Sequence, residues 1–302
     1  MIENSFLGSD GVKIFYDKYE CENPKAILQI VHGSIEHSKR YGELAEYLKE
    51  NGLTVYAADL RGHGRSLNNK LNYLSDDDNG WELYIEETKT MTELIKKEYP
   101  GKKIFIMGHS MGSFVVRDYL SKHSNLVDGA ILSGTGSTPP ITMKIAQRII
   151  KSEMKKHGKD AYSKKLHKLI YGGLDKKVRK YNATSFMSRD ENVVKKFNED
   201  PLCGETITID YAKEMSKGIL YVEKKKCFNN VKNIPLYIFS GEKDPVGGRN
   251  CNSVKRIHKR YMRAGLEDTT IKIYPGALHE MINEINKEEA YGDISNWIEM
   301  KI

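Results

Sequence analysis

Apolar and polar residues follow two different periods along the first part of the chain. Short apolar runs predict strands over residues 12–19, 25–32, 53–59, 103–109 and 127–133. Apolar residues at helical spacing predict helices over residues 40–50, 81–98 and 111–122. Strands that alternate with helices are typical of a mostly parallel central sheet flanked by helices, so we predict an α/β fold.

This alternation is interrupted once. Residues 138–232 contain helical, basic stretches but no convincing buried strand. The pattern then predicts strands and helices in turn over residues 235–240, 249–264, 270–274 and 287–300. An insertion that returns to the same sheet edge forms a lid over that edge. We therefore predict a core domain of residues 1–137 and 233–302, and a helical cap of residues 138–232 inserted between late strands.

Charge divides the chain in the same way. The sequence has 48 Lys and Arg against 41 Asp and Glu, a net charge of +7. Residues 138–232 hold 22 of these basic and 11 of these acidic residues, a net charge of +11, so the remainder has a net charge of −4. An excess of this kind is expected either on a solvated surface or beside an anionic partner such as a membrane surface. The chain has no recognised nucleic-acid motif, so we expect no nucleic-acid partner.

Composition indicates a globular protein of a reducing compartment. Of the 302 residues, 39% are hydrophobic, yet no apolar run approaches the length of a membrane-spanning helix. The N-terminal residues have neither a basic region nor a long apolar region, as a secretory signal would. The four cysteines form no CxxC pair, which argues against a disulfide framework or a zinc site. We expect a cytoplasmic location, possible peripheral contact with a membrane, and no metal.

A candidate nucleophile follows the strand predicted over residues 103–109. Residues 108–112 read Gly-His-Ser-Met-Gly, a G-x-S-x-G pattern between a buried strand and a helix. A tight turn there would expose Ser110, and the start of the following helix would point backbone N–H groups at the same place. The alternative is an ordinary glycine-rich turn.

A serine nucleophile needs a base and a carboxylate that orients the base. Asp244 follows the strand predicted over residues 235–240, and His279 follows the strand predicted over residues 270–274. Both follow the carboxyl ends of strands, where the binding and catalytic sites of parallel sheets are found. We predict Asp244 and His279 as acid and base, with Glu242 as the alternative acid.

The loop after the strand over residues 25–32 is the candidate for an oxyanion hole. Such a hole needs two N–H donors near the attacked carbonyl. We predict the backbone N–H groups of Met111, which follows the nucleophile, and of Ser34. In the same loop we expect His32 to brace the backbone, and Glu36 and Arg40 to form a buried ion pair rather than a catalytic or metal cluster.

Six segments together resemble the monoacylglycerol lipase and lysophospholipase branch of the α/β-hydrolases, also described as serine aminopeptidase-like. They are HGSIEHSKRY (32–41), DLRGHGRS (59–66), GHSMGS (108–113), NEDPLCG (198–204), GEKDPVGG (241–248) and LHEMINE (278–284). The resemblance spans nearly the whole chain. It implies an α/β-hydrolase fold, the triad Ser110, Asp244 and His279, and an oxyanion hole at Ser34 and Met111.

The resemblance also implies that no cofactor is needed and that the cap builds the acyl pocket. It assigns Asp59, Arg61 and residues 62–64 to the scaffold. The family commonly carries a small apolar residue where this chain has Ser34. We expect hydrolysis of an ester of a single acyl chain, with a small-molecule carboxylesterase or a serine aminopeptidase as alternatives. A binding protein on an inactive scaffold has no need of a complete triad, whereas haloperoxidase activity uses the same triad and stays open.

The first helix of the cap is predicted to be amphipathic. Over residues 139–156 we expect one apolar face and one basic face, with Ile141, Ile145, Ile149 and Met154 opposite Lys144, Arg148, Lys151 and Lys155. A basic amphipathic helix can lie on an anionic lipid surface, or it can pack its apolar face on the core.

Overall fold

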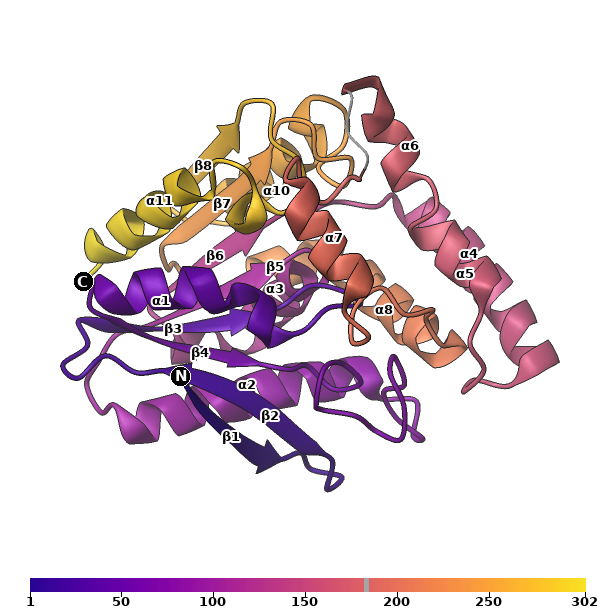
Figure 1. Ribbon diagram of the computed structural model, residues 1–302, viewed down its shortest axis with the longest axis horizontal. Coiled ribbons are helices and arrows are strands. Elements are labelled where there is room, and N and C mark those ends of the chain that lie inside the picture. The colour runs from indigo at the N-terminus through magenta and orange to yellow at the C-terminus, as the bar shows by residue number, and fades with distance from the viewer. Residues whose placement is uncertain (182–184) are drawn as a thin grey trace.

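The computed structural model describes residues 1–181 and 185–302 (Figure 1). Within them one sheet of eight strands has the order β1-β2-β4-β3-β5-β6-β7-β8. The strands are β1 (Ile2–Leu7), β2 (Lys13–Tyr19), β3 (Ala26–Val31), β4 (Leu53–Ala58), β5 (Ile104–His109), β6 (Gly129–Ser133), β7 (Leu236–Gly241) and β8 (Thr269–Tyr274). From β4 to β8 all neighbours in the sheet pair in parallel, which confirms the predicted mostly parallel sheet.

Strand β1 is absent from the sequence prediction. It pairs antiparallel with β2 alone, at the edge of the sheet, and β2 pairs antiparallel with β4. Its side chains are mostly exposed, so its sequence carries no apolar alternation. Backbone pairing with β2, rather than burial, holds this strand in the sheet.

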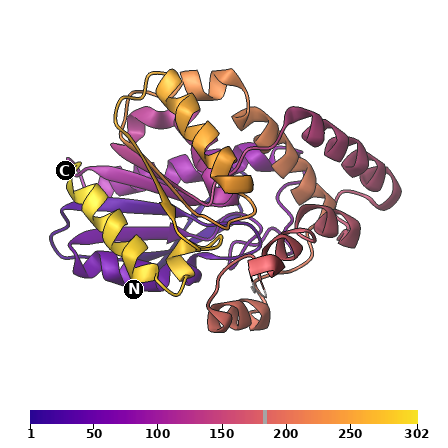
Figure 2. The same cartoon turned by 90° about the horizontal axis from the view of Figure 1, so that it is seen from above.

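Helices cover both faces of the sheet. The helices of the described residues, those of the cap included, are α1 (Gly42–Glu50), α2 (Gly80–Glu98), α3 (Met111–His123), α4 (Pro140–His157), α5 (Lys164–Ile170), α6 (Leu174–Val178), α7 (Glu191–Glu199), α8 (Ile209–Val222), α9 (Lys225–Asn229), α10 (Asn252–Arg263) and α11 (Lys287–Glu299). Short 3-10 turns are η1 (Ser38–Tyr41), η2 (Ser124–Leu126), η3 (Arg179–Tyr181), η4 (Arg249–Cys251) and η5 (Met281–Asn283). Two apolar cores result: α1 and α11 pack on one face, and α2, α3 and α10 on the other (Figure 2).

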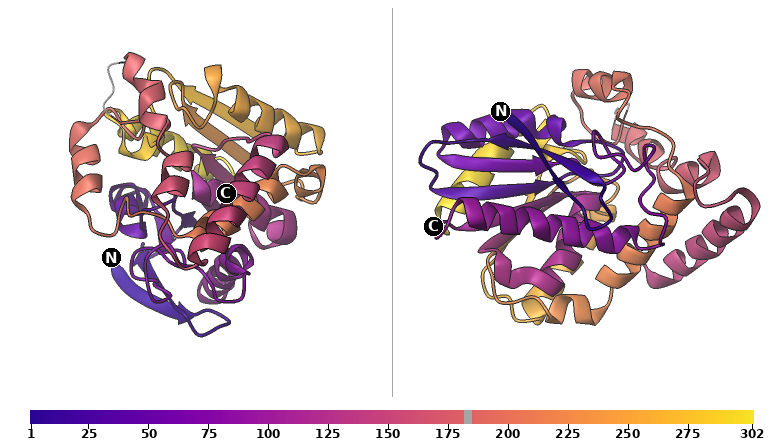
Figure 3. Two further views of the ribbon diagram at one scale, coloured as in Figure 1. Left: turned by 90° about the vertical axis from the view of Figure 1, so that its right-hand side faces the viewer. Right: turned by 90° about the horizontal axis from the view of Figure 1, so that it is seen from below.

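Helices α4 to α9 lie between β6 and β7 in the chain, in the range predicted for the cap. They gather at the end of the sheet toward which the parallel strands point (Figure 3). Helices α8 and α9 also contact α3 of the core. Residues 182–184 of the predicted cap lie outside the described residues.

Burial on α4 corrects the predicted apolar face. Ile149 and Met154 are partly buried against the apolar core that contains α2, α3 and α10. Ile141 and Ile145, by contrast, are 66% and 51% exposed. The side of α4 that packs inward centres on Met143 and Ile150 instead. The prediction that all four residues share one face is therefore wrong, because Met154 lies about 140° around the helix from Ile141 at 100° per residue. The four basic residues of the predicted polar face are all exposed.

The part of the chain that the structure describes contains no helix with the length and hydropathy needed to cross a bilayer.

The contact between α8 and α2 gives a prediction for folding stability. A Cβ atom added at Gly218 would lie 2.0 Å from Cε2 of Trp81, whose Nε1 donates a 2.8 Å hydrogen bond to Asp118 Oδ2. The ring is buried and held, so Gly218→Ala should lower the free energy of unfolding by about 1–3 kcal/mol. Gly292→Ala in α11 is the matched control: the nearest atom is 3.8 Å away, and the helix should gain about 0.5–1 kcal/mol. Urea unfolding measures both, and equal effects would contradict the packing argument.

Candidate active site

Ser110 occupies a strained turn between β5 and α3. Its φ and ψ are 51° and −117°, values that side-chain-bearing residues rarely adopt. A Cβ at Gly108 would lie 2.3 Å from the carbonyl oxygen of Gly112, and one at Gly112 would lie 2.2 Å from that of Val31. Only glycine fits at both places. The two glycines of the G-x-S-x-G pattern are therefore required by the close approach of three backbone segments, the end of β3, the end of β5 and the start of α3.

His279 and Asp244 come together from the loops after β8 and β7. His279 Nδ1 lies 3.0 Å from Asp244 Oδ2, and both side chains are buried. Asp244 also accepts hydrogen bonds from Val246 N and Ser240 Oγ at 2.8 and 3.2 Å. These contacts fix the carboxylate against the imidazole.

Glu242, the alternative acid, lies in a different environment. Its side chain is 45% exposed and 3.1 Å from Lys243 Nζ. Its Oε2 accepts a 2.9 Å hydrogen bond from Gly276 N. The structure thus brings Asp244 rather than Glu242 to His279.

Two opposing effects act on the pKa of His279. Burial, the largest single effect, disfavours the imidazolium and would lower the pKa, but the adjacent carboxylate of Asp244, with those of Glu280 and Glu36, stabilises that form and together they outweigh burial. The pKa of His279 is therefore raised above its ordinary value of 6.5. The neighbouring His109 behaves oppositely: burial and the charge of His279 lower its pKa to about 4.

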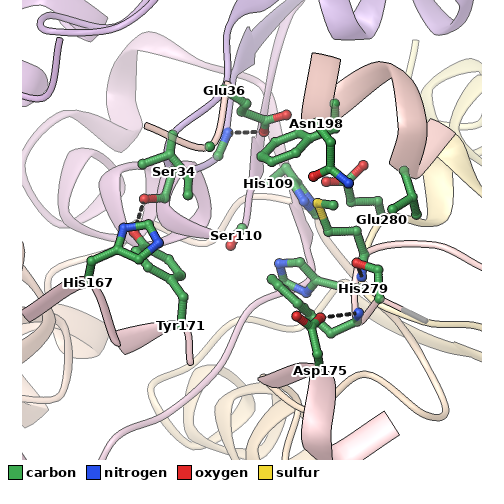
Figure 4. A pocket seen from close by; sticks show the side chains of 18 residues that line it. Ser34, Glu36, His109, Ser110, His167, Tyr171, Asp175, Asn198, His279 and Glu280 are labelled. Carbon is green, nitrogen blue, oxygen red and sulfur yellow. Dashed lines mark hydrogen bonds between the residues drawn. The ribbon is translucent and has the colours of Figure 1, made fainter. Parts of the chain in front are cut away.

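Ser110 and His279 line one pocket of about 300 Å³ together with residues of the cap (Figure 4). The cap supplies Tyr171, Asp175 and Asn198 among the residues that face the cavity. The backbone of the cap also contacts the loop after β8, because Phe186 O accepts a 3.1 Å hydrogen bond from His279 N. Core and cap therefore build the pocket jointly.

The loop after β3 is braced by buried charges. Glu36 accepts a 2.6 Å hydrogen bond from Gly33 N and forms an ion pair with Arg40. Arg40 Nη2 also lies 2.6 Å from Glu280 Oε2, beside His279. The predicted ion pair between Glu36 and Arg40 is confirmed.

His32 has the bracing position expected of it. Its Nε2 accepts a 2.8 Å hydrogen bond from Leu60 N, and its Nδ1 lies 2.7 Å from Gly33 O. The N–H groups of Ser34 and Met111 donate to no other group among residues 1–181 and 185–302. Both remain available to a ligand oxygen.

Three polar groups near the site escaped the sequence prediction. His109 packs against His279 with ring centroids 4.8 Å apart, and Glu280 holds Arg40. Tyr171 reaches the site from the cap and contacts Ser34 Oγ. His109 and Glu280 are next to Ser110 and His279 in the sequence, and this adjacency could have identified them. No feature of the sequence around Tyr171 indicates that it reaches the site.

A possible metal-ligand cluster consists of His37, Asp200 and Cys203, whose ligand atoms lie within 4.8 Å of one another. His37 Nε2 is already 2.8 Å from Asp200 Oδ2. Burial raises the pKa of the Cys203 thiol, which keeps it protonated. We interpret this cluster as a hydrogen-bonded contact between core and cap.

Comparison with known proteins assigns the family. A family model described as "Serine aminopeptidase, S33" matches residues 22–286. The chain belongs to this family. The match confirms the predicted resemblance, and with the observed sheet and helices it confirms the predicted α/β-hydrolase fold.

Relatives of this S33 family member are similar over nearly their whole length. Monoacylglycerol lipase from Mycolicibacterium smegmatis is 28% identical over 98% of this chain and 96% of its own. Monoglyceride lipase from Homo sapiens is 26% identical over 98% of this chain and 89% of its own. The crystal structure of a thermostable carboxyl esterase from Bacillus coagulans superposes with a TM-score of 0.87 at 24% identity, covering 99% of this chain and 98% of that one.

The geometry around His279 predicts a specific titration. NMR of the imidazole should give a midpoint above 6.5, because the Asp244 carboxylate stabilises the protonated form. Asp244→Asn should lower the midpoint, because burial is then opposed only by the carboxylates of Glu280 and Glu36. Glu242→Gln is the matched control and should leave it unchanged. A midpoint at or below 6.5 in the unsubstituted protein would contradict this account.

Proposed function

We propose that the protein hydrolyses esters of a single acyl chain, of the monoacylglycerol or lysophospholipid kind, with Ser110 as nucleophile, His279 as base and Asp244 as orienting acid. Ester hydrolysis itself follows from the family and from relatives that include monoacylglycerol lipases. The observation that carries the proposal is the buried His279–Asp244 pair, which shares one pocket with the strained Ser110.

The mechanism follows from these contacts. His279 takes the hydroxyl proton of Ser110 as its oxygen attacks the ester carbonyl. The negative charge on the carbonyl oxygen is stabilised by the N–H groups of Ser34 and Met111. Asp244 stabilises the imidazolium that forms. His279 then protonates the leaving alcohol, and water attacks the acyl-enzyme with His279 again as base. These steps need no cofactor.

The cap holds an apolar cavity that shares no lining residue with the catalytic pocket and offers a surface suited to a hydrocarbon chain. It measures about 470 Å³ and is lined by apolar residues of α4, α5 and α8. Helix α5 lies between it and the catalytic pocket, with Leu166, Leu169 and Ile170 toward the cavity and His167 and Tyr171 toward Ser110. A chain of methylene groups is the ligand that such a surface favours.

One observation favours a second candidate, cleavage of an N-terminal amino acid. A peptidase of this type needs a carboxylate for the free amino group, and Asp175 faces the catalytic pocket (Figure 4). Its Oδ1 accepts a 2.9 Å hydrogen bond from Phe186 N, which leaves Oδ2 for a cation. The net charge of +11 on residues 138–232 opposes this function.

We further propose a cytoplasmic location with peripheral contact at anionic membranes. All four cysteines are free, as expected of a reducing compartment. Ile141 and Ile145 are exposed on α4 beside the exposed basic residues Lys144 and Arg148. Apolar side chains next to cations suit the boundary of an anionic bilayer.

The substrate class is tested on purified protein with monoacylglycerols, lysophosphatidylcholine, short p-nitrophenyl esters and an aminoacyl amide. We expect fatty acid release from one lipid class. Ser110→Ala should abolish it, and Asp244→Asn should lower kcat by about 10⁴-fold. Glu242→Gln, the matched control, should keep full activity. Cleavage of the amide without any ester hydrolysis would favour the second candidate, and turnover of short esters alone would overturn the lipid substrate.

Membrane contact is tested by sedimentation with vesicles of phosphatidylcholine and phosphatidylglycerol. Replacing both Ile141 and Ile145 by Ser should weaken binding by about a hundredfold or more, because each buried isoleucine contributes about 1.5–3 kcal/mol and about 1.4 kcal/mol corresponds to a factor of ten. Met300→Ser, an exposed apolar residue at the end of α11, is the control and should bind as the parent does. Equal binding to vesicles of phosphatidylcholine alone would contradict the role of charge.

A further inference from the structure

Four side chains form a continuous chain of polar contacts across the boundary between core and cap. Ser34 Oγ is hydrogen-bonded to the hydroxyls of Tyr171 and Tyr211. Tyr211 Oη in turn donates a 3.0 Å hydrogen bond to Met111 Sδ. Tyr171 directly follows α5 and Tyr211 lies in α8, so both tyrosines belong to the cap. Ser34 and Met111 belong to the core.

Counting protons fixes the direction of this chain. A thioether sulfur accepts but does not donate, so the proton of Tyr211 goes to Met111. Ser34 must then donate to Tyr211, and Tyr171 must donate to Ser34. Each hydroxyl gives its single proton to one neighbour, and every contact in the chain is satisfied. Burial raises the pKa of both tyrosines, so both keep the protons that this arrangement needs.

The chain of contacts includes both residues proposed to form the oxyanion hole. Tyr211 Oη contacts the side chains of both Ser34 and Met111, whose N–H groups have no acceptor within the described residues. One cap hydroxyl therefore bridges the two strand-end segments on which the donors sit. Tyr211 and Met111 are fully buried, so water does not compete for these contacts.

The backbone beside Ser34 needs such support. Ile35 has a φ of 51°, which is strained for a β-branched residue. Its carbonyl oxygen accepts a 2.9 Å hydrogen bond from Gly204 N, a second contact from the cap. Strain of this kind persists only where surrounding contacts hold it, and here those contacts come from the cap.

We propose that Tyr211 and Tyr171 are positioning residues that hold the N–H groups of Ser34 and Met111 at the separation the oxyanion requires, so that seating of the cap and transition-state stabilisation are coupled. This inference rests on the proposed function. It gives the hydroxyl of Ser34, where the family commonly carries a small apolar residue, a role distinct from that of its N–H group.

The test is Tyr211→Phe, which removes one oxygen and keeps the ring. On a short p-nitrophenyl ester, kcat should fall by about 10–100-fold with KM unchanged, less than the loss of a whole oxyanion donor. The pH midpoint of the reaction should stay the same, because His279 is not contacted. Ser34→Ala should behave alike, and the double variant should lose little more, since both break one chain.

Two further variants keep the inference falsifiable. Tyr171→Phe, at the partly exposed end, should show a smaller loss in the same direction even if Tyr211→Phe folds poorly. Tyr119→Phe is the matched control: its buried hydroxyl donates to Thr92 Oγ1 at 3.0 Å, and its removal should leave kcat unchanged. A raised KM with unchanged kcat in Tyr211→Phe, or fully additive losses, would overturn the inference.

Phosphonylation of Ser110 by a fluorophosphonate separates this inference from the proposed function. The reaction needs the nucleophile and the oxyanion donors but no particular substrate. It should be slowed in Tyr211→Phe by the same factor as kcat. Equal rates in parent and variant would overturn the inference alone, whereas an unreactive parent protein would overturn the proposed function and the inference with it.

Discussion

The site depends on one largely buried cation. Arg40 pairs with Glu36 in the loop after β3 and with Glu280 beside His279, and the ring of Phe197 from α7 lies 4.8 Å from its guanidinium. It therefore joins the proposed oxyanion loop after β3, the loop after β8 that carries His279, and the cap. Because removal of one partner from a buried ion pair costs about 3–5 kcal/mol, these three segments are held in one arrangement.

Around that cation, the cap is part of the catalytic framework as well as a cover. Phe186 and Met187 accept backbone hydrogen bonds from His279 and Glu280, and Gly204 donates to Ile35. These bonds run from the cap to the two loops that carry the proposed base and oxyanion donor. A displacement of the cap would disturb both loops at once.

Strain in this molecule is placed where the proposed chemistry occurs. Ser110 and Ile35 both have positive φ angles, and neither is glycine. The first is fixed by the close approach of Gly108 and Gly112, which comes from the core alone. The second is held from the cap. The proposed nucleophile is thus preorganised by the sheet, whereas the proposed oxyanion loop depends on contacts between the two parts of the chain.

Local sequence patterns were enough to predict most of the fold and the candidate catalytic residues. Strands β2 to β8 and the core helices follow from apolar periodicity, since burial against a sheet imposes that periodicity on the sequence. Position after a strand singled out Ser110, Asp244 and His279, because parallel strands bring their carboxyl ends to one edge. Strand β1 escaped prediction, because an exposed edge strand has no such periodicity.

The tertiary structure alone decided what the cap contributes. Tyr171 and Tyr211 contact Ser34 across 137 and 177 residues of sequence, and no local period marks a contact of that separation. The same holds for the packing side of α4, where a helix with apolar residues on more than one side is oriented by its neighbours. The sequence specified which residues carry the proposed chemistry, whereas folding of the cap onto the core determined how they are held.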